Sequence, residues 1–249
     1  ERMHQADGGH RGQRVDEIAE RAQPHDKQPS QRFGHQPAVS VVPRRSFDNR
    51  TMINRMTSAV HRFLPAVLPV LLALAVYGGA GRLGFVNLDD DQYVYENPRV
   101  LGGLTGDDVR WALTTGHQGV WIPATWISLQ ADAARGQGAP AAFHRTNLLL
   151  HLVNVLLVFA LVRSLTGGRW RAAAVAAVFA VHPLNVEAVA WITARKDLLM
   201  AGWSLAAILC WRLADARWTR PWAWAALACA VVALASKPQA VALPVAMVL

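Results

Sequence analysis

The fold follows from residues 63–81, FLPAVLPVLLALAVYGGAG, which contain no charged side chain. Residues 146–162, 172–186, 198–211 and 221–236 are equally free of charge. A helix needs about 20 apolar residues to cross a hydrocarbon core about 30 Å thick. The runs therefore predict an all-α, polytopic membrane protein with about six transmembrane helices. We expect these helices at 63–81, 146–165, 170–186, 197–216, 220–236 and from about residue 239 onward.

The composition agrees with a membrane protein and argues against nucleic-acid binding. The chain has 249 residues, of which 53% are hydrophobic and 17% charged, and its formal net charge is +8. No run of Lys and Arg alternates with aromatic residues, and beyond residue 62 the basic residues stand mainly at the ends of apolar runs. Basic residues at such places anchor helices at the membrane surface and set their orientation. We expect the lipid bilayer, and no nucleic acid, as a partner.

The N-terminal part differs from the rest of the chain. Residues 1–51 are polar, rich in Arg, Gln, His and Pro, and lack hydrophobic periodicity, as disordered segments do. Met52 and Met56 stand just before the first apolar run and are candidate natural starts. We interpret residues 1–56 as a disordered or non-native extension and residues 57–249 as the membrane domain. Because the sequence ends within its sixth apolar run, we expect this domain to be C-terminally truncated.

The orientation in the membrane follows from the connections between the runs. Residues 163–171 and 212–220 are rich in Arg, which is typical of cytoplasmic connections. An even number of crossings separates the N-terminus from each, so the N-terminus is also expected in the cytoplasm. The long connection 82–145 then lies outside. The first run is also compatible with a cleaved signal peptide, although its length favours a membrane helix.

The connection 82–145 should contain two short amphipathic helices. Thr105 followed by Asp108 has the form of a capping box, which predicts that a helix begins there. A second helix should begin near Pro123, with Trp126, Leu129 and Ala133 on one face. We expect both helices to lie on the outer membrane surface, where tryptophans such as Trp126 favour the headgroup level.

Three consecutive carboxylates, Asp89, Asp90 and Asp91, follow the first apolar run. Adjacent carboxylates repel one another, and burial near a membrane would raise the pKa of at least one of them toward that of a general base. The same oxygens could bind a divalent cation. An acidic turn exposed to solvent is the simpler alternative. The position beside an outer membrane surface favours a catalytic group.

Basic side chains occur on the same predicted side, against the usual charge distribution of membrane proteins. Arg195, Lys196 and Lys237 could neutralise a lipid phosphate, or could simply extend toward the membrane surface. His182-Pro183 should end the third helix. Glu187, Trp191 and Arg195 would then share one helical face, where Glu187 and Arg195 could form an ion pair or belong to the site.

Several motifs together resemble a known family. They comprise FVNLDDD (85–91) with ENP (96–98), VRWA (109–112), WIPATW (121–126), FHRTNL (143–148) with HLVN (151–154), and HPLNVEAVAW (182–191) with RKD (195–197). In order and spacing they resemble the membrane domain of bacterial tetratricopeptide-repeat proteins related to the transmembrane-and-TPR O-mannosyltransferases. That family is similar to the GT-C class of glycosyltransferases. No 34-residue repeat is visible in this sequence.

The resemblance implies a reaction and a place for it. Such enzymes transfer a sugar, such as mannose, from a polyprenyl-phosphate donor to a protein or other hydroxyl acceptor outside the cytoplasm. The acidic motif of the first outer loop supplies the base, which carries this role onto Asp89-Asp90, with Asp91 as an extra acid. Arg195, Lys196 and Lys237, together with Glu187 and His182, are the residues expected at the lipid phosphate. The resemblance also implies a multi-pass protein of the bacterial inner membrane.

A transporter or a non-catalytic membrane scaffold is the competing interpretation. Transporters also carry charged residues and broken helices within the membrane. Their functional charges should lie near the middle of the bilayer, whereas the charges here gather near one predicted surface. This distribution favours the transferase.

Overall fold

The computed structural model describes residues 49–215 and 217–248, and every regular element within these ranges is a helix. The all-α prediction is thereby confirmed for this part of the chain. The longer helices are α1 (Asn49–Tyr77), α4 (Pro123–Gly136), α5 (Pro140–Thr166), α6 (Arg169–Val181), α8 (Arg195–Leu213) and α9 (Pro221–Ser236). The shorter ones are α2 (Pro98–Leu101), α3 (Gly106–Thr114), α7 (Asn185–Ala190) and α10 (Leu243–Val248).

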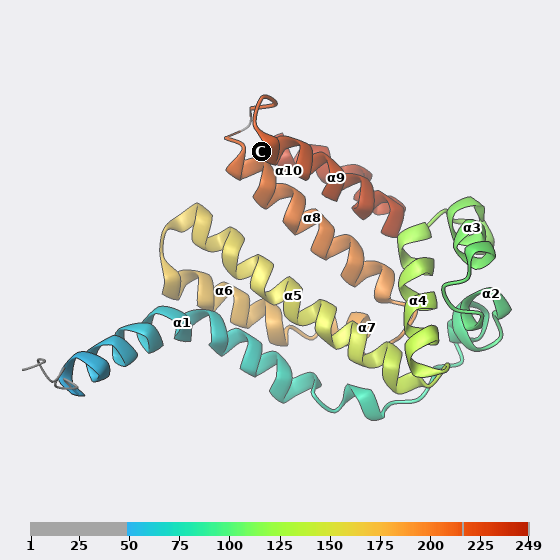
Figure 1. The fold of residues 1–249 in the computed structure, drawn as a ribbon, viewed down its shortest axis with the longest axis horizontal. Coiled ribbons are helices and arrows are strands. Elements are labelled where there is room, and N and C mark those ends of the chain that lie inside the picture. Colours follow the sequence, from blue (N-terminus) through green and yellow to red (C-terminus); the bar gives the residue numbers. More distant parts are fainter. Residues whose placement is uncertain (1–48, 216, 249) are drawn as a thin grey trace, which may run out of the picture. The chain divides into compact units, whose positions relative to one another are not determined.

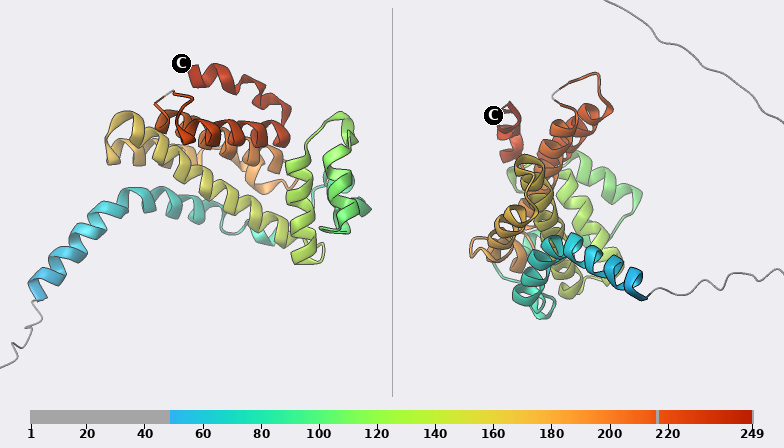
Figure 2. Two further views of the ribbon diagram at one scale, coloured as in Figure 1. Left: turned by 45° about the horizontal axis from the view of Figure 1, so that its top comes forward. Right: turned by 90° about the vertical axis from the view of Figure 1, so that its left-hand side faces the viewer.

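Helix α5 is the centre of the bundle. It packs against α6 and α1 on one side and against α8 on the other, and α9 in turn covers α8. Helices α2, α3 and α4 gather at one end of the long helices (Figure 1). The left view of Figure 2 shows the same arrangement from another side. The predicted outer connection therefore forms a separate helical group at the end of the bundle.

Small residues allow the long helices to approach closely. Ala172, Ala173, Ala176 and Ala180 of α6 are all buried in the cluster that α6 forms with α1 and α5. At the crossing of α5 and α8, a Cβ atom on Gly202 would lie 2.6 Å from Oδ1 of Asn154. Close packing through alanine and glycine is typical of helices that associate in lipid, where apolar side chains gain nothing by leaving their surroundings.

Two helical segments are long and apolar enough to cross a membrane, Phe63–Arg82 and Pro140–Thr166. Both present large apolar side chains outward, such as Leu71 and Leu149. Helix α6 has 13 residues and spans only about 20 Å, less than a hydrocarbon core, and α8 begins with three charged residues. The prediction of about six transmembrane helices therefore stays a prediction.

The helical group at the end of the bundle has a core of its own. Trp126 and Leu129 of α4 are fully buried together with Tyr93 and Val100. Thr105 caps α3 as predicted, with its hydroxyl oxygen accepting the Asp108 N–H at 3.2 Å, and α4 begins at Pro123 as predicted. The expectation that Trp126 lies at the lipid headgroups was wrong, because its ring stacks on that of Tyr93 at 4.7 Å in the core.

Two boundaries differ from the sequence-based expectation. Residues 1–48 of the expected extension lie outside the described residues, whereas residues 49–56 form the start of α1.

Pro183 separates α6 from α7 as predicted. However, α7 ends at Ala190 and Trp191 is extended, so Glu187, Trp191 and Arg195 do not share one helical face. The interruption of the helix at residues 191–194 gives these side chains separate surroundings.

Candidate functional site

Asp90 is completely buried and holds two distant segments together. Its Oδ2 accepts the N–H of Val86 at 2.9 Å. Its Oδ1 accepts both the N–H of Thr193 at 3.1 Å and the Thr193 hydroxyl at 2.6 Å. A carboxylate with both oxygens engaged in this way stabilises the fold and has no free lone pair pointing to solvent for proton transfer. The middle residue of the acidic motif therefore ties the loop after α1 to the segment that precedes α8.

The three carboxylates face different surroundings because the chain turns immediately after them. Asp90 precedes a π-helical turn, Asp91–Tyr95, a rare backbone form that is frequent at functional sites. Asp91 acts electrostatically on Tyr95, and its Oδ1 is buried without a hydrogen-bond partner among the described residues. Asp89 is half-buried, and its charge acts on Tyr93 and on Lys196.

Lys196 is a basic group on which the charge of the acidic motif acts, through Asp89. Its Nζ lies 4.9 Å from the centre of the Tyr93 ring and 5.8 Å from that of Trp191, which is the geometry of cation–π contacts. Burial lowers the pKa of Lys196. The carboxylate of Asp89 acts in the opposite direction, as do those of Asp197 and Glu187, while the charge of Lys237 lowers this pKa further.

Lys237 reaches the same place from the end of α9. Its ammonium forms an ion pair with Asp197, and the Thr125 hydroxyl of α4 donates to the Ser236 carbonyl at 2.9 Å, which fixes the neighbouring backbone. Lys196 and Lys237 both line a cavity of about 300 Å³, whose wall also includes Tyr93, Ile122 and Gln239. Two cations from separate elements thus line one cavity, and the charge of Asp89 acts on one of them, Lys196.

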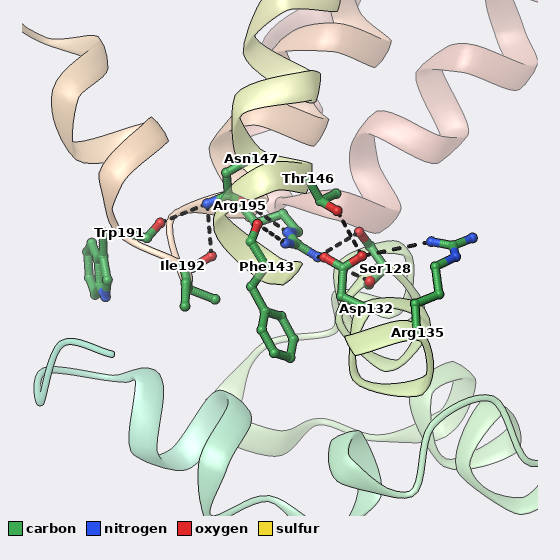
Figure 3. Close-up of polar contacts among 9 residues, drawn as sticks. All are labelled: Ser128, Asp132, Arg135, Phe143, Thr146, Asn147, Trp191, Ile192 and Arg195. Atoms are coloured by element: carbon green, nitrogen blue, oxygen red, sulfur yellow. Dashed lines mark hydrogen bonds and ion pairs between the residues drawn. The ribbon is translucent and has the colours of Figure 1, made fainter. Parts of the chain in front are cut away.

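Arg195 has a different place from its neighbour Lys196. Its side chain is fully buried and forms an ion pair with Oδ2 of Asp132 at 2.5 Å. Nε donates to Oδ1 of Asn147 at 2.8 Å, and the terminal nitrogens donate to the carbonyls of Phe143 at 2.7 Å and Ser128 at 3.1 Å (Figure 3). The guanidinium is buried and engaged in hydrogen bonds and an ion pair within the protein, so we do not include Arg195 among the groups that would contact a phosphate.

The remaining predicted site residues lie around two other cavities. Glu187 is exposed and lines a cavity of about 390 Å³ that Asp197 and Lys237 also border. His182 is exposed and lines an apolar cavity of about 570 Å³ beside α6. Its Nδ1 accepts the N–H of Leu184 at 3.3 Å. Glu187 therefore lies at the edge of the charged cluster through Lys237, whereas His182 belongs to an apolar surface.

Within the described residues, no group of three His, Cys, Asp or Glu side chains is arranged to hold a metal ion. The two histidines of α5 bind backbone oxygens instead. Nε2 of His144 lies 3.2 Å from the Gly84 carbonyl oxygen, and Nε2 of His151 lies 3.0 Å from that of Ala180.

Sequence reasoning missed the residues that hold the site together. Asn147, His151 and Asn154 recur at helical spacing within an apolar run, and all three are buried on the inner face of α5. Polar residues inside a membrane-like helix usually face partners, so this stripe was a usable signal. Thr193 and Asp132 carry no comparable signal, because nothing in their local sequence indicates a distant partner.

The comparisons with known proteins point to one group of enzymes. The chain is 34% identical over 161 residues to protein O-mannosyl-transferase Tmtc2 of Drosophila melanogaster, which covers 61% of this chain and 16% of that protein. It is 34% identical over 149 residues to Tmtc1 of the same fly, covering 57% and 17%. It is 32% identical over 152 residues to mouse TMTC1, covering 55% and 16%.

These matches cover only part of each protein, since the chain spans about one sixth of the length of the curated relatives it matches. No family model matches the chain, and no solved structure does. The sequence similarity nevertheless extends over more than half of this chain in each case. The chain is therefore related in sequence to the TMTC protein O-mannosyl-transferases.

Proposed function

We propose that this chain is part of the membrane domain of a glycosyltransferase of the GT-C type. It transfers a sugar, mannose in the first instance, from a polyprenyl-phosphate donor to a hydroxyl of a protein acceptor on the extracytoplasmic face of the membrane. The observation that carries the proposal is the cavity that Lys196 and Lys237 line together, while the charge of Asp89 acts on Lys196. The names of the related proteins, which are O-mannosyl-transferases, support the same reaction.

In this proposal Asp89 is the base. Its carboxylate takes the proton of the acceptor hydroxyl while the hydroxyl oxygen bonds to the anomeric carbon of the sugar. The bond between that carbon and the phosphate oxygen breaks, and its electron pair leaves with the polyprenyl phosphate. The cations of Lys196 and Lys237 stabilise the negative charge that develops on the departing phosphate. Asp89 then returns its proton to water.

The other two carboxylates have different roles in this proposal. Asp90 holds the loop to Thr193 and so fixes the position of the neighbouring Asp89, whereas the charge of Asp91 acts on Tyr95. Glu187 and Asp197 balance the two cations, which keeps them from repelling each other when no phosphate is bound.

The membrane orientation is part of the same proposal. The Arg-rich connection after α5 and the one after α8 would face the cytoplasm of a bacterial inner membrane, together with the N-terminus. The acidic motif, the start of α8 and Lys237 would then all lie at the outer surface, where a flipped lipid-linked sugar is available.

The test replaces each carboxylate in the full-length protein and follows sugar transfer from the lipid donor in membranes. Asp89→Asn should reduce transfer by about 100-fold or more without changing stability, because it removes only the base. Asp90→Asn should lower the free energy of unfolding by about 2 kcal/mol or more. The NH2 group of the asparagine would face an N–H donor of Val86 or Thr193, where the carboxylate now accepts a hydrogen bond. Asp107→Asn, at the exposed start of α3, is the control and should behave as wild type.

Wild-type transfer by Asp89→Asn would overturn the assignment of the base. If the full-length protein transfers no sugar, and substitutions in the acidic motif abolish uptake of a solute, the protein is a transporter.

A further inference from the structure

The buried ion pair between Arg195 and Asp132 lies directly beside the charged cavity but contacts none of it. Arg195 is 0% exposed and the side chain of Asp132 only 4%. Removing an ion from water is costly, and such a pair is often no more stable than an apolar replacement. Stability alone therefore does not account for a fully buried arginine in this place.

The contacts of the pair suggest that it fixes one short segment. Asn147 of α5 uses both ends of its amide: Oδ1 accepts from Nε of Arg195, and Nδ2 donates to the Trp191 carbonyl at 3.0 Å (Figure 3). The amide thereby contacts both ends of the turn 191–194, which connects α7 to α8, through the Trp191 carbonyl before it and Arg195 after it. On its other side, the same segment is held by the two hydrogen bonds from Thr193 to Asp90.

Asp132 is itself held in place. Its Oδ1 accepts the Thr146 hydroxyl at 2.8 Å, and Oδ2 meets Arg195. Arg135 also approaches Oδ1, but at 3.8 Å and with its own side chain 76% exposed. The carboxylate is therefore bound on its inner side by two oriented contacts and on its outer side by one loose contact.

Lys196 follows Arg195 directly, and Trp191, one of the two rings under its ammonium, belongs to the fixed segment. We propose that Arg195 and Asp132 are positioning residues: their buried ion pair fixes the first turn of α8 and so places the Lys196 ammonium against Tyr93 and Trp191. The contribution of this placement to catalysis rests on the function proposed above, whereas the placement itself does not.

The placement can be measured without any activity assay, by the pH dependence of Lys196 modification with an amine-reactive reagent in the full-length protein. The midpoint reports the pKa of Lys196, which burial lowers. The charges acting on it are Asp89, Lys237, Asp197 and Glu187, and Asp132 is not among them. Asp132→Asn should release the segment, let water reach Lys196 and raise the midpoint, a change of about three- to tenfold in the acid dissociation constant.

Arg135→Gln is the matched control, since it removes the exposed partner of the same carboxylate and should leave the midpoint unchanged. A folded Asp132→Asn protein with the wild-type midpoint would overturn the proposal, and so would equal shifts in the two variants. If Asp132→Asn does not fold, Thr146→Val takes its place and should give a smaller shift in the same direction. The absence of a shift in that variant also overturns the proposal.

Kinetics separate this proposal from the proposed function. Because Lys196 would act on charge that develops only in the transition state, Asp132→Asn should lower kcat about tenfold with little change in KM. A raised labelling midpoint in a protein whose wild type transfers no sugar would keep the positioning role and refute the transferase. An unchanged midpoint in an active transferase would do the reverse.

Discussion

The helical group at the end of the bundle and the long helices are built by different rules. In the end group, large side chains such as Trp126, Tyr93 and Phe143 fill a core, and the buried Gln130 amide donates to the carbonyls of Arg99 and Asp108. Between the long helices the buried residues are mainly alanines, and the large apolar side chains point outward. The first region resembles the interior of a water-soluble domain, and the second is packed as helices in lipid are.

This difference explains where the charged cavity lies. Buried ionic groups need a rigid polar surrounding, which a surface of alanine and leucine does not supply. The cavity with Lys196 and Lys237 occurs where the two regions meet, at the start of α8 and the end of α9. Each region should therefore respond differently to substitution.

The largest effect is expected in the core of the end group. Trp126→Ala removes a fully buried ring and should lower the free energy of unfolding by about 3–5 kcal/mol. Denaturant unfolding in mixed micelles measures it. Trp121→Ala is the matched control: Trp121 is 52% exposed and makes one hydrogen bond, so its loss should cost about 1 kcal/mol or less. Equal losses in the two variants would show that the end group has no rigid core.

An intermediate effect is expected between the long helices. Ala176→Leu adds three carbon atoms at a fully buried contact and should destabilise the protein by about 1–3 kcal/mol. On the exposed side of the same helix, Ala174→Leu should have almost no effect in the same unfolding measurement. A tolerated Ala176→Leu would mean that the helices do not depend on close contact through small residues.

The smallest effect is expected where the two regions meet, in the pKa of Tyr93. Burial raises the pKa of Tyr93, and the negative charge of Asp89 raises it further because it disfavours the tyrosinate. Asp89→Asn should therefore lower this pKa, although burial keeps it above its ordinary value. The absorbance of tyrosinate against pH gives the shift. In Asp91→Asn the shift should instead be found at Tyr95, and a Tyr93 shift there would contradict the separation of the two carboxylates.

Much of the architecture could be predicted from the sequence, because composition and local spacing determine it. The charge-free runs indicated the helices, Thr105 and Pro123 marked helix starts, and Pro183 marked a break. The number of membrane crossings depends on lipid contacts and stays a prediction. Trp126 was misplaced because an amphipathic helix has the same pattern whether its apolar face meets lipid or protein.

The candidate site was predictable only in part. The charges of Asp89, Lys196 and Lys237 stand out beside apolar runs, so sequence alone made them candidates, and their role stays a prediction. The true partner of Arg195 was not, because Asp132 is 63 positions earlier in the chain and only tertiary packing brings the two together. Glu187 looked like a partner from helical spacing, but the helix is interrupted at residues 191–194, before α8, and this breaks that spacing.

The π-helical turn at Asp91–Tyr95 has a consequence for how this sequence can change. Each step along a helix rotates the side chain by about 100°. Removing one residue just before the turn would therefore shift the motif by one position, so that one aspartate takes the place of its chemically identical neighbour. The composition of the motif would hardly change, yet the aspartates would exchange surroundings. The aspartate that acts on Lys196 would take the position now buried against Thr193, or the buried aspartate would take the position that acts on Lys196. Insertions and deletions at this point should therefore be far less tolerated than exchanges between Asp and Glu.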